Sequence, residues 1–488
     1  MSKMPRQKFL PIDDVTVENV DKLFSFVMIG GKMRVVRRVP SAADEDGEAL
    51  TLEFMSPDEF KKAFVNKTKK IVVTVRGNQD DPDDDNMDFD VPVKKLLTTK
   101  TIKKTIAEYH MMNPRRVTYD RLVFQADPDK VRPTDYNMWN GFSVRPIKGN
   151  WRLMDNMILD SLANNDPEVW LYIKKWCAWK LQNPTRRTEA AMVFRSDKQG
   201  TGKGLLGNGM CRFFGSHAVH LYRADSLTAR FNSQLAMCAF LFDDESTYSG
   251  DKKSASAAKG LITESTIDIE KKGVDVITLP NALGIIKATN SKWAVPAESG
   301  DRRYAIFETS NEMANDQAYF RPIIDQLKGD GGAGYSAMLY DLLRMDLGDW
   351  HPRADIPQTA ASADQKTLSL AAEDQWLLGF LESGVLPHTN PKWPNRVTSP
   401  SSLYAEARRN SPSLRFWSDV QFARYLDEWG IPAKSSHGIY RDFGPLMALR
   451  ARWMDRFPWY QGFANSGEWT DERSEHEDLP DAMDLDFG

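Results

Sequence analysis

Residues 196–204 read Ser196-Asp-Lys-Gln-Gly-Thr-Gly-Lys203-Gly204, and this stretch decides the fold class. A tight glycine-rich turn lets consecutive backbone N–H groups point at one anion, and a following lysine can reach the outer phosphates of a nucleotide. The apolar run Ala190–Phe194 comes directly before the turn, and residues 204–214 can form the helix that follows. Strand, glycine loop and helix in this order predict a phosphate-binding loop in an α/β protein.

Two positions of the loop depart from the usual pattern G-x-x-x-x-G-K-[ST]. Asp197 stands at the place of the first glycine, and Gly204 at the place of a hydroxyl residue that normally binds Mg²⁺. The loop alone is therefore also compatible with an ordinary strand–turn–helix connection. Later motifs favour the nucleotide site, so we expect ATP to contact Gln199, Gly200, Thr201, Gly202, Lys203 and Gly204.

Two further apolar runs end in polar residues. Cys238–Phe242 is followed by Asp243-Asp244-Glu245, and Leu283–Ala288 is followed by Thr289-Asn290. Carboxylates at the end of a buried strand can hold Mg²⁺ and orient a water for attack on a γ-phosphate. An amide at a neighbouring strand end can position that water. These patterns predict a magnesium site at the end of the first of these runs, where Asp243, Asp244 and Glu245 lie.

Two arginines complete the series of motifs. Asp301-Arg302-Arg303-Tyr304 precedes the apolar run Ala305–Phe307. Lysine loop, acidic strand end, amide strand end and arginines thus follow one another, with 41 residues from Lys203 to Asp244 and 46 from there to Asn290. This block resembles the superfamily 3 helicases of small viruses, phages and plasmids, whose ring-forming ATPase core belongs to the AAA+ class.

More closely, the chain looks like the phage and plasmid primase-helicase family. The resemblance covers roughly residues 110–365 and implies a member without the primase-polymerase domain that many relatives carry upstream. The phrases that carry it are Asn137-Met-Trp-Asn-Gly-Phe142, Gln199-Gly-Thr-Gly-Lys-Gly204, Arg230-Phe-Asn232, Lys259-Gly-Leu-Ile-Thr263, Ile269-Glu-Lys-Lys-Gly273 and Asp301-Arg-Arg303.

The resemblance implies a role for each polar residue of the block. Lys203 would contact the β- and γ-phosphates, and Asp244 would hold Mg²⁺, a role that Asp243 could share. Glu245 would activate water, and Asn290 would be the sensor asparagine.

Arg302 would be the arginine finger that reaches into a neighbour's site in a ring, which we expect to be a hexamer. Arg303 would serve its own subunit or fold the loop. Surface salt bridges are the alternative for both arginines.

A β-hairpin is predicted between the acidic strand and the sensor strand. Apolar residues alternate around Lys271-Lys272-Gly273, with Ile267 and Ile269 before the turn and Val274 and Val276 after it. The resemblance implies that this hairpin grips single-stranded DNA, because ammonium groups pair with phosphates without reading sequence. A solvated hairpin tip is the alternative.

Composition indicates a large protein without membrane or disulfide features. The chain has 488 residues, 41% of them hydrophobic, and three cysteines, Cys177, Cys211 and Cys238, without a CxxC pair. No apolar run is long enough to span a membrane, and Met1–Arg6 lacks the apolar core of a signal peptide. We therefore expect no disulfide framework, no zinc ribbon, no membrane partner and a location in the cytoplasm, that of the host cell if a phage encodes the chain.

Charge is unevenly distributed. The whole chain carries −4, the tail 466–488 carries −8 and the run 80–90 carries −7, so the remainder carries +11. A basic body with segregated acids suits a protein that handles nucleic acid. The tail ends in Phe487-Gly488 and resembles tails that recruit replication partners, while a solubilising disordered end is the alternative.

Outside the ATPase block the chain shows weaker signals. Phe26–Ile29 and Met33–Val36 flank a Gly-Gly turn and predict a hairpin, and Ile71–Val75 predicts a strand. An aromatic stripe in residues 155–181 is typical of a helix core. Three predicted helices at 374–382, 401–410 and 418–429, followed by a short hairpin, favour a winged helix. It would contact duplex DNA through Arg408, Arg409, Arg415, Arg424 and Arg441, or else serve as a structural lid.

The predicted architecture is an α/β, AAA+-like P-loop ATPase core between two smaller regions. Its parts are an N-terminal α+β domain with an acidic loop (1–100), a helical collar (101–185), the superfamily 3-type core (186–350), a linker (351–372), a winged-helix-like domain (373–465) and an acidic disordered tail (466–488).

The function implied is an ATP-dependent, ring-forming replicative DNA helicase of a phage or mobile element that moves along single-stranded DNA. A nucleotide-switched, origin-binding initiator with slow ATPase and a DNA-sensing defence ATPase are the alternatives.

Overall fold

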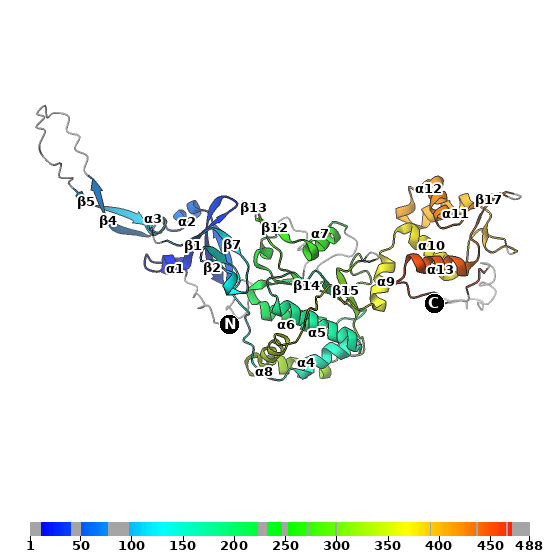
Figure 1. Cartoon of the computed structure of the whole chain (residues 1–488), viewed down its shortest axis with the longest axis horizontal. Coiled ribbons are helices and arrows are strands. Elements are labelled where there is room, and N and C mark those ends of the chain that lie inside the picture. Colours follow the sequence, from blue (N-terminus) through cyan, green and yellow to red (C-terminus); the bar gives the residue numbers. More distant parts are fainter. Residues whose placement is uncertain are drawn as a thin grey trace, which may run out of the picture.

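The computed structural model describes residues 11–40, 50–76, 97–114, 116–222, 232–245, 252–271, 274–297, 300–390, 392–435, 438–464 and 467–470. These residues form three lobes in a row (Figure 1). The acidic run 80–90, residues 471–488 of the acidic tail and the first two residues of the Arg230–Asn232 phrase lie outside this set. Within it, no helix is both long enough and apolar enough to cross a membrane.

The middle lobe contains a parallel five-stranded sheet in the order β10-β11-β14-β9-β15. The three apolar runs predicted as buried strands are confirmed as β9, β11 and β14. Because β14 lies between β9 and β11, the carboxyl ends of all three meet at one edge of the sheet. The strands are β9 (Ala191–Arg195), β10 (Ala218–Leu221), β11 (Phe240–Asp244), β14 (Gly284–Thr289) and β15 (Tyr304–Glu308).

One face of this sheet is covered by helices. Phe194 and Phe242 face a core shared with α4 (Arg152–Met157), α5 (Pro167–Gln182), α6 (Lys203–Phe214) and α8 (Gln317–Leu342), which is interrupted by non-helical residues 329–332. Helix α6 packs so closely that a Cβ at Gly207 would overlap the Phe242 ring.

The other face of the sheet contacts α7 (Lys252–Thr263) and the hairpin of β12 (Thr266–Lys271) and β13 (Val274–Pro280). Val193, Leu241 and Ile285 point into this second core. Burial on both faces explains why the strands read as continuous apolar runs.

Helix α5, which follows α4, holds the aromatic stripe. Tyr172, Trp176 and Trp179 are buried, as expected for core residues. Residues 158–162 form a turn of π-helix between them. The structure packs both helices on the five-stranded sheet, so this part of the segment expected to be a collar shares its core with the middle lobe.

The N-terminal lobe is built on the sheet order β3-β2-β1-β6, with β1–β2 and β2–β3 antiparallel and β1–β6 parallel. The predicted Gly-Gly hairpin is confirmed: Ile29 pairs with Lys32 across two glycines of positive φ. Phe24, Phe26, Phe60 and Phe64 form its core. Its elements are α1 (Val20–Leu23), β1 (Phe24–Ile29), β2 (Lys32–Pro40), β3 (Leu50–Met55), α2 (Pro57–Ala63), α3 (Ile106–Met112) and β6 (Thr118–Tyr119).

Two smaller strand pairs belong to the same half of the chain. β4 (Thr68–Arg76), which confirms the predicted strand, pairs antiparallel with β5 (Leu97–Thr105). β7 (Arg121–Val123) pairs in parallel with β8 (Asp135–Asn137).

The C-terminal lobe contains the predicted helices and hairpin, joined by one helix that was not foreseen. Around a core that includes Phe422, Trp429 and Trp453 lie α10 (Ala372–Ser383), α11 (Pro400–Asn410), α12 (Asp419–Glu428), α13 (Leu446–Arg456) and the antiparallel strands β16 (Arg396–Val397), β17 (Ala433–Ser435) and β18 (Ile439–Asp442).

Two of the arginines expected to contact DNA hold this lobe together instead. Arg441 is 4% exposed and bonds to Asp427, the Tyr404 hydroxyl and the Ile431 carbonyl. Arg408 bonds to Asp419 and the Trp417 carbonyl.

Part of the expected linker is ordered as helix α9 (Ala360–Leu368). Ala361 joins the core on the second face of the sheet, and the Thr359 hydroxyl donates to the Ile306 carbonyl of β15 at 2.6 Å. The helix therefore extends the middle lobe toward the C-terminal lobe (Figure 1).

Candidate nucleotide-binding site

The predicted loop lies between β9 and α6, and two of its glycines have backbone angles that favour glycine. Gly200 has φ 72° and Gly202 has φ 86°, the latter as the N-cap of α6. A Cβ at Gly202 would lie 2.9 Å from both the Met157 sulfur and the Phe320 ring. Positive φ and close packing together mean that a larger residue at 202 would distort the loop.

The back of the loop is fixed by hydrogen bonds to the helical face. The Ser161 hydroxyl donates to the Thr201 carbonyl at 2.6 Å, and the Asn315 N–H donates to the Gly200 carbonyl at 3.1 Å. Thr201 itself is 1% exposed, with its hydroxyl 3.2 Å from that of Thr309. Thr201 can therefore offer a ligand only its backbone, whereas Gln199 is exposed.

Lys203 is the first residue of α6, and its side chain is buried at the end of β9 and β14. Its ammonium donates to the Ser196 hydroxyl and, at 2.7 Å, to the Asn290 side-chain oxygen. Burial lowers the pKa of Lys203, and the carboxylates of Glu245 and Asp244 partly oppose that shift. Both bonds go to neutral oxygens, so a phosphate would give this buried cation a counter-charge in direct contact.

Asn290 connects the lysine to a carboxylate. Its side-chain N–H donates to Glu245, while its oxygen accepts from Lys203. The predicted lysine, amide and acid therefore meet in one cluster, although they come from α6, the end of β14 and the end of β11. Glu245 is exposed and has φ 56°, a left-handed backbone angle.

The two aspartates before Glu245 lie in different surroundings. Asp243 is buried and forms an ion pair with Lys287 at 2.9 Å. Asp244 is 42% exposed in its side chain and lies 3.6 Å from His220 of β10. Of the two candidate metal ligands, Asp244 is the one on the accessible side of the strand.

A magnesium site here would use few protein ligands. No group of three or more His, Cys, Asp or Glu side chains suited to a metal occurs in the described part of the chain. Mg²⁺ at nucleotide sites is usually held by one or two carboxylates together with phosphate oxygens and waters. Asp244 and Glu245 at the end of β11 fit that donor set.

The two arginines have separate surroundings. Arg303 bonds to the almost fully buried Asp301 at 2.8 Å, which supports a role in folding the loop. Arg302 is exposed and forms no ion pair with any described carboxylate. It precedes β15, whose first residue pairs with the first residue of β9. Arg302 therefore lies at the edge of the sheet opposite the lysine loop, about 16 Å of strand away.

Arg302 also lines a cavity of about 620 Å³. The other walls include Lys366 of α9 and Trp459 and Tyr460, which follow α13.

The predicted hairpin is confirmed in its backbone. β12 and β13 pair antiparallel from Thr266↔Pro280 to Lys271↔Val274. Lys272 and Gly273 at the tip lie outside the described residues, so the DNA-binding role of Lys271 and Lys272 stays a prediction.

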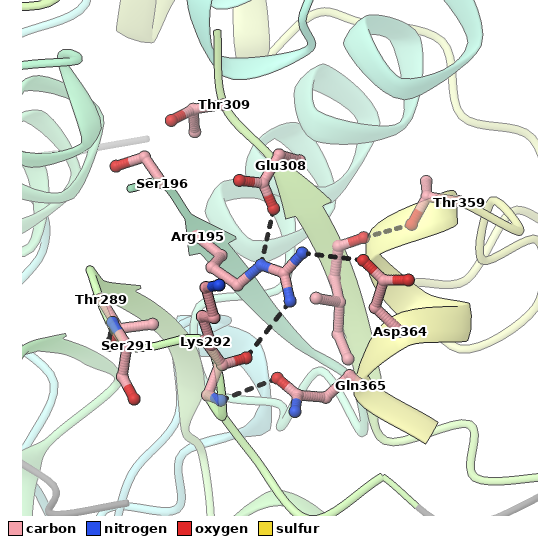
Figure 2. A network of polar contacts seen from close by, with 12 residues as sticks. Arg195, Ser196, Thr289, Ser291, Lys292, Glu308, Thr309, Thr359, Asp364 and Gln365 are labelled. Carbon is pink, nitrogen blue, oxygen red and sulfur yellow. Dashed lines mark hydrogen bonds and ion pairs between the residues drawn. The ribbon is translucent and has the colours of Figure 1, made fainter. Parts of the chain in front are cut away.

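A polar network beside the site was not found from the sequence. Figure 2 shows Arg195, the last residue of β9, bonded to Glu308 of β15 at 2.6 Å, to Asp364 of α9 at 3.2 Å and to the Lys292 carbonyl. Ser196, which contacts Lys203, is the next residue along the chain. Isolated serine, arginine and histidine residues give no sequence signal, because their partners are distant in the chain.

The same block of motifs matches a known protein family. Residues 194–303 match the model of DUF5906, a family of unknown function. The DNA primase-polymerase of Nitratiruptor phage NrS-1 is 28% identical to this chain over 174 residues, which are 35% of this chain and 24% of the phage protein. The matched region thus spans about a quarter of that relative's length.

Solved structures of the NrS-1 C-terminal region have a similar fold. An apo structure of its residues 305–718 superposes with a TM-score of 0.54 at 15% identity and covers 86% of this chain and 96% of that one. An A-form apo structure of the same region gives 0.52 at the same identity and coverage. The mixed α/β fold with a parallel five-stranded sheet is therefore shared with part of a phage primase-polymerase.

Proposed function

We propose that this chain is an ATP-driven DNA helicase that acts as a ring in the replication of a phage or related element. What supports the proposal is the meeting of Lys203, Asn290 and Glu245 at the carboxyl edge of a parallel sheet. A cation for phosphates, an amide and an acid within one hydrogen-bonded cluster suit the hydrolysis of a nucleoside triphosphate.

In the proposed reaction, the loop N–H groups and Lys203 bind the outer phosphates. Glu245 accepts a proton from the attacking water, and Asn290 orients that water because it already contacts the acid. Mg²⁺, bound with the nucleotide beside Asp244, would neutralise phosphate charge during transfer.

Arg302 is proposed to complete the site of a neighbouring copy. Its position at the opposite sheet edge favours contact with a neighbouring copy over contact with a nucleotide in its own loop, because a neighbour in a ring could present its site there. The β12–β13 hairpin would contact single-stranded DNA through its lysines and move with hydrolysis.

The replication setting rests on the phage relative, whose printed name is DNA primase-polymerase. Strand separation is an activity that a primase and a polymerase both need, which favours a helicase role for a related chain.

The test combines nucleotide and unwinding assays on single variants. Lys203→Ala should lose about 1.5–3 kcal/mol of ATP binding, since one charge-assisted contact disappears. Glu245→Gln should bind ATP but hydrolyse it about a hundred- to ten-thousandfold more slowly. Both should fail to unwind a forked duplex, as the wild type should with a non-hydrolysable analogue.

Lys198→Ala is the matched control, because Lys198 is an exposed lysine of the same loop. It should keep most activity. Normal hydrolysis by the Lys203 and Glu245 variants would refute the site.

A second candidate function is a nucleotide-switched initiator with slow hydrolysis. Gly204 favours it, since the hydroxyl that usually binds Mg²⁺ is absent from the loop. ATP-dependent DNA binding without strand separation by the wild-type protein would identify the initiator.

A further inference from the structure

Strands β4 and β5 form a two-stranded ribbon that projects from the N-terminal lobe, away from the five-stranded sheet (Figure 1). Nine residue pairs run from Thr68↔Thr105 to Arg76↔Leu97, which corresponds to about 30 Å. A two-stranded ribbon without a packed face is marginally stable alone. The side chains on the surface of the ribbon indicate which kind of partner could bind it.

The ribbon carries only positive charge. Its strands read Thr68-Lys-Lys-Ile-Val-Val-Thr-Val-Arg76 and Leu97-Thr-Thr-Lys-Thr-Ile-Lys-Lys-Thr105, with six cations and no acid. The register places Lys69 opposite Lys104 and Lys70 opposite Lys103. Like charges directly opposite each other destabilise a strand pair. A polyanion bound along the ribbon would remove this repulsion.

One of these lysines already has a partner. Lys69 lies 3.0 Å from Glu18, whose pKa is lowered to about 2 by hydrogen bonds from Thr16 and Lys69. Lys70 and Lys103 are exposed and form no ion pair with any carboxylate in the described part of the chain. The connection between the strands, which includes the run 80–90, lies outside that part.

The alternation of the strands gives the Lys70 face a polar character. Thr68, Lys70, Thr101, Lys103 and Thr105 lie on this face, together with the exposed Val72. Hydroxyl and ammonium groups are among the side-chain groups that contact the phosphates of DNA.

We propose that the β4–β5 ribbon binds duplex DNA through its phosphates, with the Lys70–Lys103 pair at the contact. This inference adds duplex binding to the proposed movement along a single strand. It rests on the proposed function only for the identity of the polyanion as DNA. A two-stranded ribbon fits the major groove, and its length of about 30 Å approaches one helical turn of about 34 Å.

Single-stranded DNA is the less suitable ligand for the ribbon. Proteins that bind single strands stack bases on aromatic side chains, and neither β4 nor β5 contains an aromatic residue. The ribbon would thus hold the unopened duplex while another part of the protein contacts the separated strand.

The test is equilibrium binding of the full chain to a labelled duplex and to a labelled single strand, without nucleotide, between about 50 and 200 mM salt. Lys70→Ala/Lys103→Ala should weaken duplex binding and reduce the slope of log affinity against log salt by about two. Single-strand affinity should stay the same. Arg145→Ala/Lys148→Ala, which removes two exposed charges from a loop of the middle lobe, is the matched control.

Unchanged duplex affinity and slope in the ribbon variant would overturn the proposal. Equal losses in the control, or equal losses for duplex and single strand, would also overturn it, because the effect would then be one of overall charge. Unfolding temperatures at or above that of the wild type should accompany the ribbon variant, since it removes a repulsive pair. A chain without ATPase activity would contradict the proposed function and leave this binding result intact.

Discussion

Gly204 sits where a side chain would fit without a clash. A Cβ built there lies 3.7 Å from its nearest neighbour, the Asn208 amide nitrogen, which is an ordinary contact. The site therefore lacks a hydroxyl without being too small for one. A serine at this position could reach the metal that Asp244 is proposed to hold.

We accordingly predict that Gly204→Ser raises ATP hydrolysis several-fold and lowers the Mg²⁺ concentration needed for half-maximal rate. Gly204→Ala is the control, because both variants gain about 0.5–1 kcal/mol of helix stability while only serine adds the hydroxyl. Steady-state rates across a magnesium titration check this. Identical curves for serine and alanine would show that no metal contact forms at 204.

At the scale of single residues, the sequence identified those that follow a buried strand. Asn290 and Glu245 could be predicted because polar residues directly after continuous apolar runs are conspicuous. Ser196 and His220 could not, since only tertiary contacts bring them to Lys203 and Asp244. Likewise, Asp243 is buried in an ion pair with Lys287 of the neighbouring strand, and the order of residues in the sequence does not reveal this pairing.

Among the elements, the segment between α6 and β10 depends on one histidine. His217 is fully buried; its Nδ1–H donates to the Met237 carbonyl at 3.0 Å, and its Nε2 accepts from the Asn140 N–H at 2.9 Å. Its ring also stacks on Trp139 with centroids 4.7 Å apart. His217 thus connects three chain segments. It can form both hydrogen bonds only as the neutral ring, because one nitrogen donates and the other accepts.

Burial lowers the pKa of His217 to about 4, against an unfolded value near 6.5. Between pH 6.5 and about pH 4, the His217 imidazole is therefore protonated in the unfolded chain and neutral in the folded chain. Stability should fall across this window and level off below it, with a loss of roughly 2 kcal/mol at pH 5.

Urea unfolding at pH 7 and pH 5 measures this loss, and His217→Gln provides the comparison. The difference between the two pH values should be about 2 kcal/mol smaller in the variant. Equal acid sensitivity of both proteins would assign the effect to other groups.

Helix α9 shows why some elements escaped prediction. Its buried positions include Ala361, Gln365 and Lys366, which do not form the apolar stripe that marks a helix in sequence. The buried side chain of Gln365 accepts a hydrogen bond from the Ala294 N–H at 2.7 Å through its oxygen. Strands β9, β11 and β14 have the opposite character, since both of their faces are apolar, and so they were predicted. Strand β10, of which only Leu221 is buried, was not predicted.

For the whole molecule, the decisive relation is between Arg302 and the lysine loop. They occupy opposite edges of one sheet, so in the proposed ring each copy holds one half of two different sites. Mixing Arg302→Ala with Lys203→Ala subunits should then restore hydrolysis, because some interfaces combine an intact loop with an intact arginine. Arginine fingers contribute about a thousandfold or more, so recovery should be measurable.

The control mixes Arg302→Ala with the double variant Lys203→Ala/Arg302→Ala, which has no intact arginine and should show no recovery. Hydrolysis rates of the mixtures, with mass measurements under ATP, check the result. No recovery from a protein that stays monomeric would argue against a ring.

The two terminal lobes also show that the role of a charged residue cannot be assigned from the sequence alone. Arg408 and Arg441 were expected at a DNA surface but pair within the C-terminal lobe. The lysines of the β4–β5 ribbon matched no sequence motif, yet the pairing of the strands places Lys70 directly opposite Lys103. Whether a cation serves the fold or a ligand depends on the neighbours that folding supplies.

The left-handed backbone of Glu245 has a consequence for how this position can vary over generations. At φ 56° the polypeptide favours glycine and tolerates asparagine, whereas branched residues such as valine or isoleucine are strained there. Replacements that keep the protein abundant therefore differ from those that keep it active. A lineage that loses the proposed chemistry should drift toward glycine or asparagine at 245, and such a residue in a descendant would record that loss while the rest of the fold persists.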